Sequence, residues 1–485
     1  MTASAMFRSA WRHRRSIDPL ALAYLGLPSL IFVAGWVRQP WGLVGALAIA
    51  ISLMATFARE PGEPICIGPR LSLAVILIAL TWCVMAGIGH LVFANADWVV
   101  RDGVLVDLVG KPWPAIYVID DVVTLMRAPI GYFLPPALIG KLFGIRAAEY
   151  ALLGWTLLGV VLVFMLMLRD RPALKPALIR LAIFIAFSGM DIVGQIAHYN
   201  PHPLGAHLEW WAFLFQYSSL TTQLFWVPNH ALPGWIAIAW LLGQDTRRLP
   251  TATAILFVVF MPLWSPLTAI GIAPIVAAAL LRQLVITRPL AFLRELINWR
   301  MLVPALACCV LIFPYLVAGS DKVASGGNAD IPWVGEDIVP RYIEFVLFEF
   351  VGFAVLLLRR DRRDPLLWAA VAVLLALPCY RFGPYNDLAM RASIPALVLL
   401  AIRLGSWLST PFVKRDLGAR LIAIALLGIG AVTPFMEFAR VFITPRWDLN
   451  ESASLPHVTR GTHYLTPLDQ PWLMLILRVP ASNRR

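Results

Sequence analysis

The chain contains several uninterrupted apolar runs that are each long enough to cross a lipid bilayer. A transmembrane α-helix needs about 20 predominantly apolar residues, and the segments 20–37, 71–92 and 147–168 approach or exceed this length. Only 14% of the 485 residues are charged and 60% are hydrophobic, whereas roughly a quarter of the residues of a soluble domain are charged. The sequence therefore excludes a soluble globular protein and predicts a polytopic membrane protein.

The distribution of basic residues predicts which loops lie in the cytoplasm. Lys and Arg collect on the cytoplasmic side of membrane proteins, so we interpret the net charge of +12 by position and not as a sign of nucleic-acid binding. A basic arm with Arg8, Arg12, Arg14 and Arg15 precedes the first apolar run, and no small-residue cleavage site follows that run. We therefore expect an uncleaved first span, in preference to a signal peptide, and a cytoplasmic N-terminus.

The alternation of basic loops orders the apolar runs into an all-α, polytopic transmembrane helical bundle of about 13 spans. The predicted spans are 20–37, 41–57, 71–92, 147–168, 178–196, 230–242, 251–263, a run that ends at 281, 301–317, 342–358, 366–379, 392–402 and 421–435. Residues 1–437 form this transmembrane domain, with extracytoplasmic loops at 93–146, 197–229, 319–341 and 380–391, and residues 438–485 form an extracytoplasmic tail. In the first loop we expect residues 120–146 to form helices that lie on the outer membrane surface.

Motifs for metals and nucleotides are weak or missing in the sequence. The five cysteines include no C-x-x-C pair, and the segment H-Y-N-P-H-P-L-G-A-H-L-E lacks an H-E-x-x-H pattern. Pro201 and Pro203 also prevent a regular helix from aligning His198 with His202. We assign no metal ligand, leave a requirement for a divalent cation open, and find no glycine-rich phosphate cradle in the inner loops.

The stretch N-A-D-W-V-V-R-D-G-V-L-V-D, residues 95–107, follows the third predicted span and contains the leading candidate site. If this stretch is helical, Asp97 and Arg101 are i, i+4 neighbours, and so are Trp98 and Asp102. Charge at the border of the hydrocarbon is costly unless it faces water or a protein cavity. We therefore expect Asp97, Arg101 and Asp102 to line an extracytoplasmic reaction cavity; a structural ion pair at the interface is the alternative.

More candidates for substrate binding occur in the segments assigned to the same side. They are Asp191, Glu209, Trp210, His230, Asp387 and Arg391, in addition to Arg101. Asp191 is a candidate partner of Asp97, because it lies near the outer end of its span. Glu209 and Trp210 either belong to an interfacial aromatic belt or form a platform for a sugar ring.

Two further positions could bind a phosphate. His230 begins a predicted span, where a histidine is either a hydrogen-bonded interfacial group or a phosphate ligand and proton relay. Asp387 and Arg391 have i, i+4 spacing just before an apolar run. Arg391 is therefore either half of an ion pair that starts a helix or a clamp for an anionic headgroup. Glu344 and Glu349, near or within a span, are expected to face the protein interior.

This arrangement resembles the GT-C class of integral membrane glycosyltransferases. The shared features are an N-terminus inside, an acidic residue at the start of a long first external loop, surface-lying helices in that loop and further polar external loops. The resemblance implies that Asp97, with Asp102 as the alternative, is the catalytic base or a metal ligand, and that the donor is a polyprenyl-phosphate sugar. The chain departs from the class in two respects: an extra apolar hairpin precedes the loop, and its acidic pair, Asp120-Asp121, comes late in the loop.

The resemblance implies transfer of a sugar from a polyprenyl-phosphate donor to a cell-envelope glycan, lipid or protein at a bacterial inner membrane. A site on the outer face has no nucleotide pool, which also favours a lipid-linked donor. Two alternatives stay open, namely a transporter or flippase of a lipid-linked or amphipathic substrate, and a non-catalytic subunit of envelope assembly. A transporter is expected to carry polar residues at mid-span in two related halves, and the sequence contains no such repeat.

Overall fold

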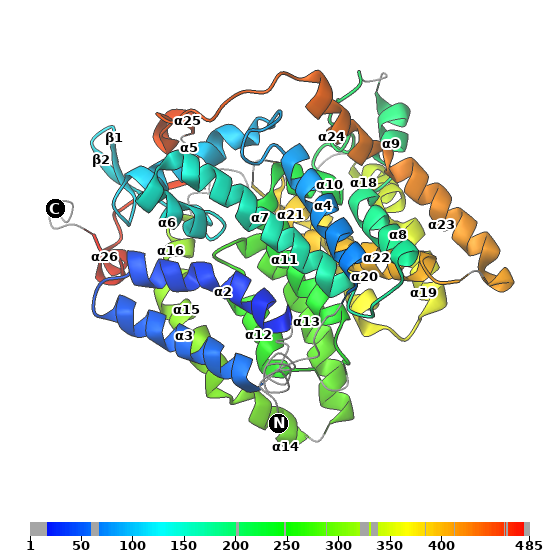
Figure 1. The fold of residues 1–485 in the computed structure, drawn as a ribbon, viewed down its shortest axis with the longest axis horizontal. Coiled ribbons are helices and arrows are strands. Elements are labelled where there is room, and N and C mark those ends of the chain that lie inside the picture. The colour runs from blue at the N-terminus through cyan, green and yellow to red at the C-terminus, as the bar shows by residue number, and fades with distance from the viewer. Residues whose placement is uncertain are drawn as a thin grey trace, which may run out of the picture.

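Helices dominate the computed structural model, and its strands are few and short (Figure 1). The structure describes residues 17–59, 67–199, 203–246, 249–287, 289–320, 329–330, 338–383, 385–411, 413–459, 461 and 464–479. The predominance of helices confirms the predicted all-α helical bundle. The basic arm at 1–16, His202, most of the predicted loop 319–341 and the last six residues of the predicted tail lie outside the described residues.

Eight helical segments among the described residues are long and apolar enough to cross a membrane. They are Ile17–Trp36 (α2), Trp41–Ala58 (within α3, Trp41–Arg59), Ile145–Met167 (α7), Leu174–His198, Pro266–Ile286 (α13), Trp299–Val317, Asp387–Leu408 and Lys414–Ile443. Shorter apolar helices are α4 (Pro69–Met85), α6 (Leu134–Phe143), α12 (Thr251–Phe260) and the segment Pro365–Cys379. The chain is therefore a multi-pass membrane protein, and the count of about 13 spans stays a prediction.

Four of the long segments are built from two helices each. The pairs are α8 (Leu174–Ala186) with α9 (Asp191–His198), α15 (Trp299–Leu311) with α16 (Phe313–Val317), α21 (Asp387–Ala392) with α22 (Ile394–Leu408), and α23 (Leu417–Gly430) with α24 (Val432–Ile443). Proline is the second residue of α16 and α22 and the third of α24. Proline lacks the amide hydrogen of a regular helix and fits best in a first turn, which explains these interruptions.

The helix α11 (Pro228–Leu242) forms the centre of the bundle. Residues 228–241 are all buried, and the helix packs against α7, α13 and α22. Such a helix needs apolar side chains around its whole circumference, and its sequence provides them after the first turn. Asn229 and His230 are the polar exceptions, and both are buried. The start of α11 therefore places two polar side chains inside the protein.

The first long loop differs in part from the prediction. The expected helix is present as α5 (Asp97–Gly110), but β1 (Ile116–Ile119) and β2 (Val122–Met126) form an antiparallel hairpin where surface helices were expected from residue 120. Asp120 and Asp121 form its turn with φ of 49° and 64°, a conformation that Asp tolerates better than most residues and that two-residue hairpins require. The prediction is therefore wrong for 120–126, whereas α6 supplies a helix later in the loop.

The C-terminal tail folds back over this loop. Its strand β5 (Leu465–Pro467) extends the hairpin by pairing with β2, so that Leu125 lies opposite Thr466. The short helix α25 (Leu455–Val458) packs on α5, and Leu477, which follows α26 (Pro471–Ile476), forms a β-bridge with Val37 at the end of α2. The tail therefore joins the first loop to the first membrane segment.

The remaining elements connect these segments. They are α10 (Leu220–Trp226), α14 (Pro289–Leu296), α18 (Ile338–Val346), the π-helical turn η2 (Leu347–Val351), α19 (Gly352–Arg360), α20 (Pro365–Ala376), the 3₁₀ turns η3 (Leu377–Cys379) and η4 (Lys414–Asp416), and the two-residue strands β3 (Ala329–Asp330) and β4 (Arg381–Phe382).

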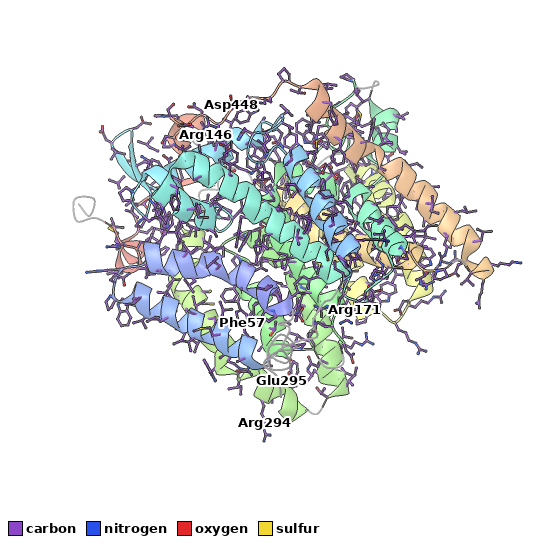
Figure 2. The ribbon with its side chains drawn as sticks, viewed as in Figure 1. Phe57, Arg146, Arg171, Arg294, Glu295 and Asp448 are labelled. Carbon is purple, nitrogen blue, oxygen red and sulfur yellow. The ribbon has the colours of Figure 1, made fainter. Side chains whose placement is uncertain are left out.

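Some residues assigned to opposite sides of the membrane lie apart in Figure 2. Arg146, at the start of α7, and Asp448, in the tail, lie near the top of the view, Arg294 of α14 lies at the bottom, and Arg171 lies between these levels. Which end faces the cytoplasm stays a prediction.

Asp107 on α5 anchors the tail, and its removal tests this attachment. The buried carboxylate accepts hydrogen bonds from Tyr117 Oη at 2.7 Å, Ser454 Oγ at 3.0 Å and the Leu455 amide at 2.7 Å. A hydrogen bond to a charged group contributes about 1.5–3 kcal/mol. We expect Asp107→Ala to reduce stability by about 3 kcal/mol, lower the thermal midpoint of the purified protein and expose the tail to limited proteolysis.

Asp448→Ala is the matched control, because this carboxylate pairs with Arg446 at the surface and is 63% exposed. An exposed pair contributes less than about 1 kcal/mol, so this variant should behave like the wild type. Equal protease resistance of the tail in both variants would contradict the anchoring role of Asp107.

Candidate functional site

A cavity of about 500 Å³ gathers polar side chains from distant parts of the chain. Its polar lining is Arg101, Arg127, Asn229, His230, Ser320, Asp387, Arg391 and Tyr464. These residues come from α5, the end of the β-hairpin, the start of α11, the turn after α16, α21 and the C-terminal tail. The structure therefore brings together four of the nine predicted site residues, Arg101, His230, Asp387 and Arg391.

Arg101 carries an unused donor at this cavity. Its Nη2 lies 3.2 Å from Asp97 Oδ2, which is the predicted i, i+4 pair. Its Nη1 is buried and donates to no acceptor among the described residues. The Asp97 side chain is 45% exposed and is not part of the cavity lining. Asp97 therefore reaches the cavity only through Arg101, which corrects the expectation that Asp97 itself lines it.

Arg391 forms the second predicted ion pair, with Asp387 Oδ1 at 2.9 Å. Both side chains line the cavity, and Asp387 is the only carboxylate of its lining within the described part of the chain. The preceding Asn386 has a left-handed backbone with φ of 56°, and its amide donates to the Leu214 carbonyl at 2.8 Å. This bond fixes the start of α21 and with it the direction of Asp387.

His230 is held as one neutral tautomer by a chain of hydroxyl groups. Its Nδ1 lies 2.6 Å from Ser265 Oγ, and Ser265 donates its proton to Thr268 Oγ1 at 2.7 Å. Because the Ser265 proton is used in this way, Nδ1 of His230 must be the donor to Ser265. A neutral imidazole has one donor and one acceptor nitrogen, so Nε2 carries the lone pair.

Sequence reasoning missed three polar residues of the cavity, Arg127, Ser320 and Tyr464. Arg127 donates from Nε and Nη2 to the Leu316 carbonyl at 3.1 and 2.6 Å, and so joins the hairpin to α16. The position of Arg127 could have identified it, because it is an arginine in a loop assigned to the outer side, whereas Lys and Arg usually collect on the inner side. Tyr464 reaches the cavity because β5 pairs with β2, a long-range contact that has no local signal.

Asp102 does not line this cavity, which corrects the prediction. Its Oδ2 lies 3.1 Å from His90 Nε2, and His90 Nδ1 lies 2.9 Å from Glu149 Oε1 on α7. The reason is helical geometry, since residue 102 is rotated by about 100° from residue 101. Asp102 thus faces α7 while Arg101 faces the cavity. Sequence reasoning missed His90 and Glu149, which have no spacing motif.

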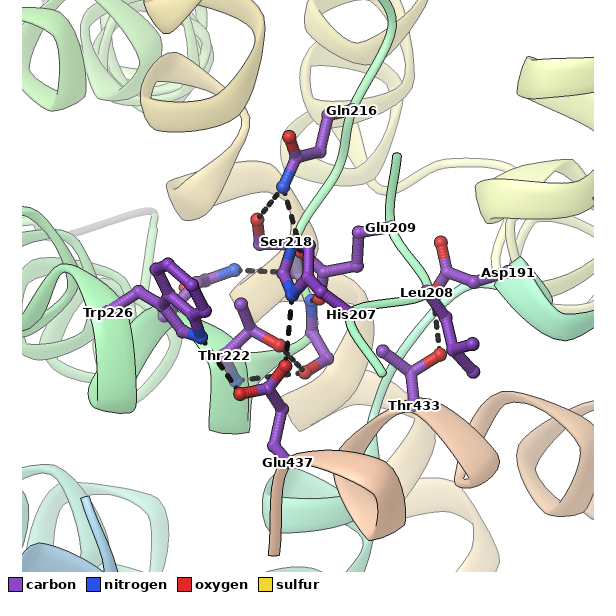
Figure 3. A network of polar contacts seen from close by, with 12 residues as sticks. Asp191, His207, Leu208, Glu209, Gln216, Ser218, Thr222, Trp226, Thr433 and Glu437 are labelled. Carbon is purple, nitrogen blue, oxygen red and sulfur yellow. Dashed lines mark hydrogen bonds and ion pairs between the residues drawn. The ribbon is translucent and has the colours of Figure 1, made fainter. Parts of the chain in front are cut away.

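Asp191 and Glu209 also lie outside the lining of the cavity, which corrects the expectation that Asp191 is the partner of Asp97. Asp191 Oδ2 accepts from Ser188 and Thr433, and Glu209 accepts from Gln216 and the Ser219 amide. Figure 3 shows Glu209 beside His207, which contacts Glu437 together with Trp226, and shows Asp191 to one side with Thr433. Segment 203–219 runs between α9 and α24, which draws these residues away from α5.

The ionisation of this second network follows from burial. Burial raises the pKa of Glu209 to about 7. Burial opposes the charge on His207, but its hydrogen bond to Glu437 Oε1, at 3.0 Å, raises the pKa of that imidazole. Trp210 differs from its neighbours because it is 61% exposed, so a role as a platform for a sugar stays a prediction.

Within the described ranges, no three or more His, Cys, Asp or Glu side chains are arranged to hold a metal ion. Comparison of the chain with protein-family models, with curated proteins and with solved structures finds no match. The candidate function therefore rests on the cavity and on the resemblance described above.

The His90 cluster predicts a pH-dependent stability. Burial disfavours the charged imidazole, but hydrogen bonds to Asp102 and Glu149 raise the pKa of His90 to about 9, against about 6.5 in an unfolded chain. The stabilisation is therefore complete below about pH 6.5 and is lost as the pH rises through about 9. We expect the wild-type protein to lose up to about 3 kcal/mol over this range relative to His90→Gln, measured as thermal midpoints at each pH.

His457→Gln, which removes a histidine of α25, is the control and should follow the wild type at every pH. A His90→Gln profile parallel to that of the wild type would show that His90 is not protonated in the folded protein.

Proposed function

We propose that the protein is a membrane glycosyltransferase that binds a polyprenyl-phosphate sugar in this cavity and transfers the sugar to a cell-envelope acceptor. The observation that supports the proposal is the meeting of three guanidinium groups, Arg101, Arg127 and Arg391, in one largely apolar cavity. Guanidinium groups bind phosphate oxygens through paired donors.

The apolar walls suit the lipid part of such a donor. They come mainly from α13 and α16 and include Ile270, Phe313 and Leu316. A second cavity of about 110 Å³, between α12 and α15, shares Phe313 and Leu316 with the first. An isoprenoid chain could therefore continue from the arginines past these two side chains into the helix bundle. A soluble nucleotide sugar has no lipid chain that could occupy this apolar extension.

The proposed reaction uses the groups that line the cavity. The oxygen of an acceptor hydroxyl attacks the anomeric carbon, and the bond from that carbon to the phosphate oxygen breaks with its electron pair left on the phosphate. Asp387 takes the hydroxyl proton as general base, or passes it to Nε2 of His230. Arg391 and Arg101 stabilise the charge that develops on the departing phosphate. Asp97 positions Arg101 by pairing with it.

Variants of the two carboxylates separate these roles. We expect Asp387→Asn to reduce transfer by at least about 100-fold, the usual contribution of a general base, with the protein still accumulating in the membrane. Asp97→Asn should give a smaller loss, because it only loosens Arg101. The measurement is mass spectrometry of envelope glycans in a strain that carries each variant, together with the amount of protein in the membrane fraction.

Arg391→Ala and Arg446→Ala form a matched pair of arginine variants. Arg391 lines the cavity, whereas Arg446 is 55% exposed and pairs with Asp448 in the tail. Transfer should be lost with Arg391→Ala and retained with Arg446→Ala. Unchanged envelope glycans in both Asp387→Asn and Arg391→Ala, at normal protein levels, would remove the enzyme hypothesis and leave the transporter or the assembly subunit.

A further inference from the structure

Three helical segments are irregular at one place outside the cavity. The segment Leu174–His198 is interrupted at 187–190 between α8 and α9, the turn η2 is π-helical, and α23 gives way to α24 at Ala431. The Met190 amide donates to the Phe348 carbonyl at 3.0 Å, which joins the first two irregular turns. Irregular backbone within a membrane protein is tolerated where it is buried against other protein, and π-helical turns often occur at functional sites.

Two carboxyl groups meet at this place, Asp191 of α9 and Glu349 of η2. Both side chains are 1% exposed, and the two carboxyl groups lie close enough to share a hydrogen bond. Gly189 makes the approach possible, because a Cβ at that position would overlap Glu349 Oε2. A second glycine, Gly194, leaves the space in which the indole of Trp211 packs against α9. The two glycines therefore allow Glu349 and Trp211 to pack closely against α9 and the turn before it.

Only two of the four carboxyl oxygen atoms of the pair accept a hydrogen bond from the surrounding donors. Asp191 Oδ2 accepts from Ser188 Oγ at 2.9 Å and from Thr433 Oγ1 at 2.8 Å, and Glu349 Oε1 accepts from Trp211 Nε1 at 3.2 Å. Asp191 Oδ1 and Glu349 Oε2 are buried and receive a hydrogen bond from no donor among the described residues. These two oxygens can be joined only by a proton that one of them carries.

The position of that proton follows from the other hydrogen bonds. Two ionised carboxylates in contact and away from water repel each other strongly, so such pairs share one proton. Two hydroxyl donors already point at Asp191, whereas Glu349 has a single indole donor. Asp191 is therefore the carboxylate and Glu349 the acid, with its O–H directed from Oε2 to Asp191 Oδ1.

We propose that Asp191 and Glu349 form a proton-binding site inside the membrane domain, and that the bound proton holds α9, η2 and α24 together. Thr433 brings α24 into the contact through its bond to Asp191. When the proton leaves, two negative charges face each other in a buried site, and the three segments separate. This site is distinct from the arginine-lined cavity and does not depend on the function proposed for that cavity.

Other ionisable groups surround the pair and set the field in which it binds the proton. They are His207 and Glu209 from segment 203–219, Glu437 and Arg440 from α24, and His198 with Glu344, which lie 2.8 Å apart beside Trp211. His207 and Arg440 both contact Glu437, so most of their positive charge is already compensated. The pair must therefore be neutralised mainly by its own proton.

Infrared spectroscopy of the full-length protein in lipid nanodiscs tests the site directly. A protonated carboxylic acid in an apolar site gives a carbonyl stretch that is separate from that of carboxylates and that shifts in heavy water. We expect this band at neutral pH in the wild type, loss of the Glu349 contribution to it in Glu349→Gln, and retention of that contribution in Glu344→Gln. Glu344 is the matched control because it lies on the adjoining helix and is 39% exposed.

Asp191→Asn provides a second test that does not need the Glu349 variant to accumulate. Removal of the acceptor should shift the Glu349 band without abolishing it. Hydrogen–deuterium exchange gives the consequence for structure: above the pH at which the band disappears, residues 187–198 should exchange several-fold faster in the wild type than in Glu349→Gln at the same pH. The reason is that the side-chain amide introduced by Glu349→Gln keeps a donor to Asp191 at every pH.

Three results would overturn the proposal. The first is a neutral-pH spectrum whose acid band is unchanged by both Glu349→Gln and Asp191→Asn. The second is loss of the band when sodium is added at constant pH, which would make the pair a cation site. The third is equal exchange of residues 187–198 in the wild type and in Glu349→Gln at every pH.

Discussion

An ion inside a membrane protein must be paired, hydrogen-bonded or placed against cavity water, because its desolvation otherwise costs several kcal/mol or more. This constraint decides which helices meet in the present structure. Arg101 and Arg391 approach the cavity with a carboxylate each, His90 lies between two carboxylates, and Asp191 contacts Glu349. The apolar surfaces of the helices could pack in many ways, whereas each polar contact fits one arrangement.

The sequence predicted the elements whose cause is local. The membrane segments follow from apolar length, and the ion pairs of Arg101 and Arg391 follow from i, i+4 spacing on a helix. It failed where the cause is long-range. Asp102 faces α7 because its partner His90 comes from the turn before α5, and Tyr464 reaches the cavity through strand pairing in the tail. The β-hairpin at 116–126 was missed because its apolar residues were interpreted as surface helices.

The cavity and the proton pair share one architectural feature, which is the interruption of membrane segments. The cavity lies where α16, α21 and α11 begin or end, and the pair lies where α8 gives way to α9 and η2 bulges. Helix ends expose backbone groups and polar side chains that a continuous apolar helix would not carry. The prolines and glycines that break these helices therefore place polar and ionisable side chains inside the bundle. The C-terminal tail contributes Tyr464 to the cavity lining.

The most direct test of the central claim is a structure of the full chain in lipid nanodiscs, determined with a polyprenyl phosphate. The account predicts a phosphate within hydrogen-bond distance of Arg101 and Arg391, with the isoprenoid chain against Phe313 and Leu316. A phosphate bound elsewhere, or a cavity in which both arginines contact only protein carboxylates at saturating lipid, would contradict it.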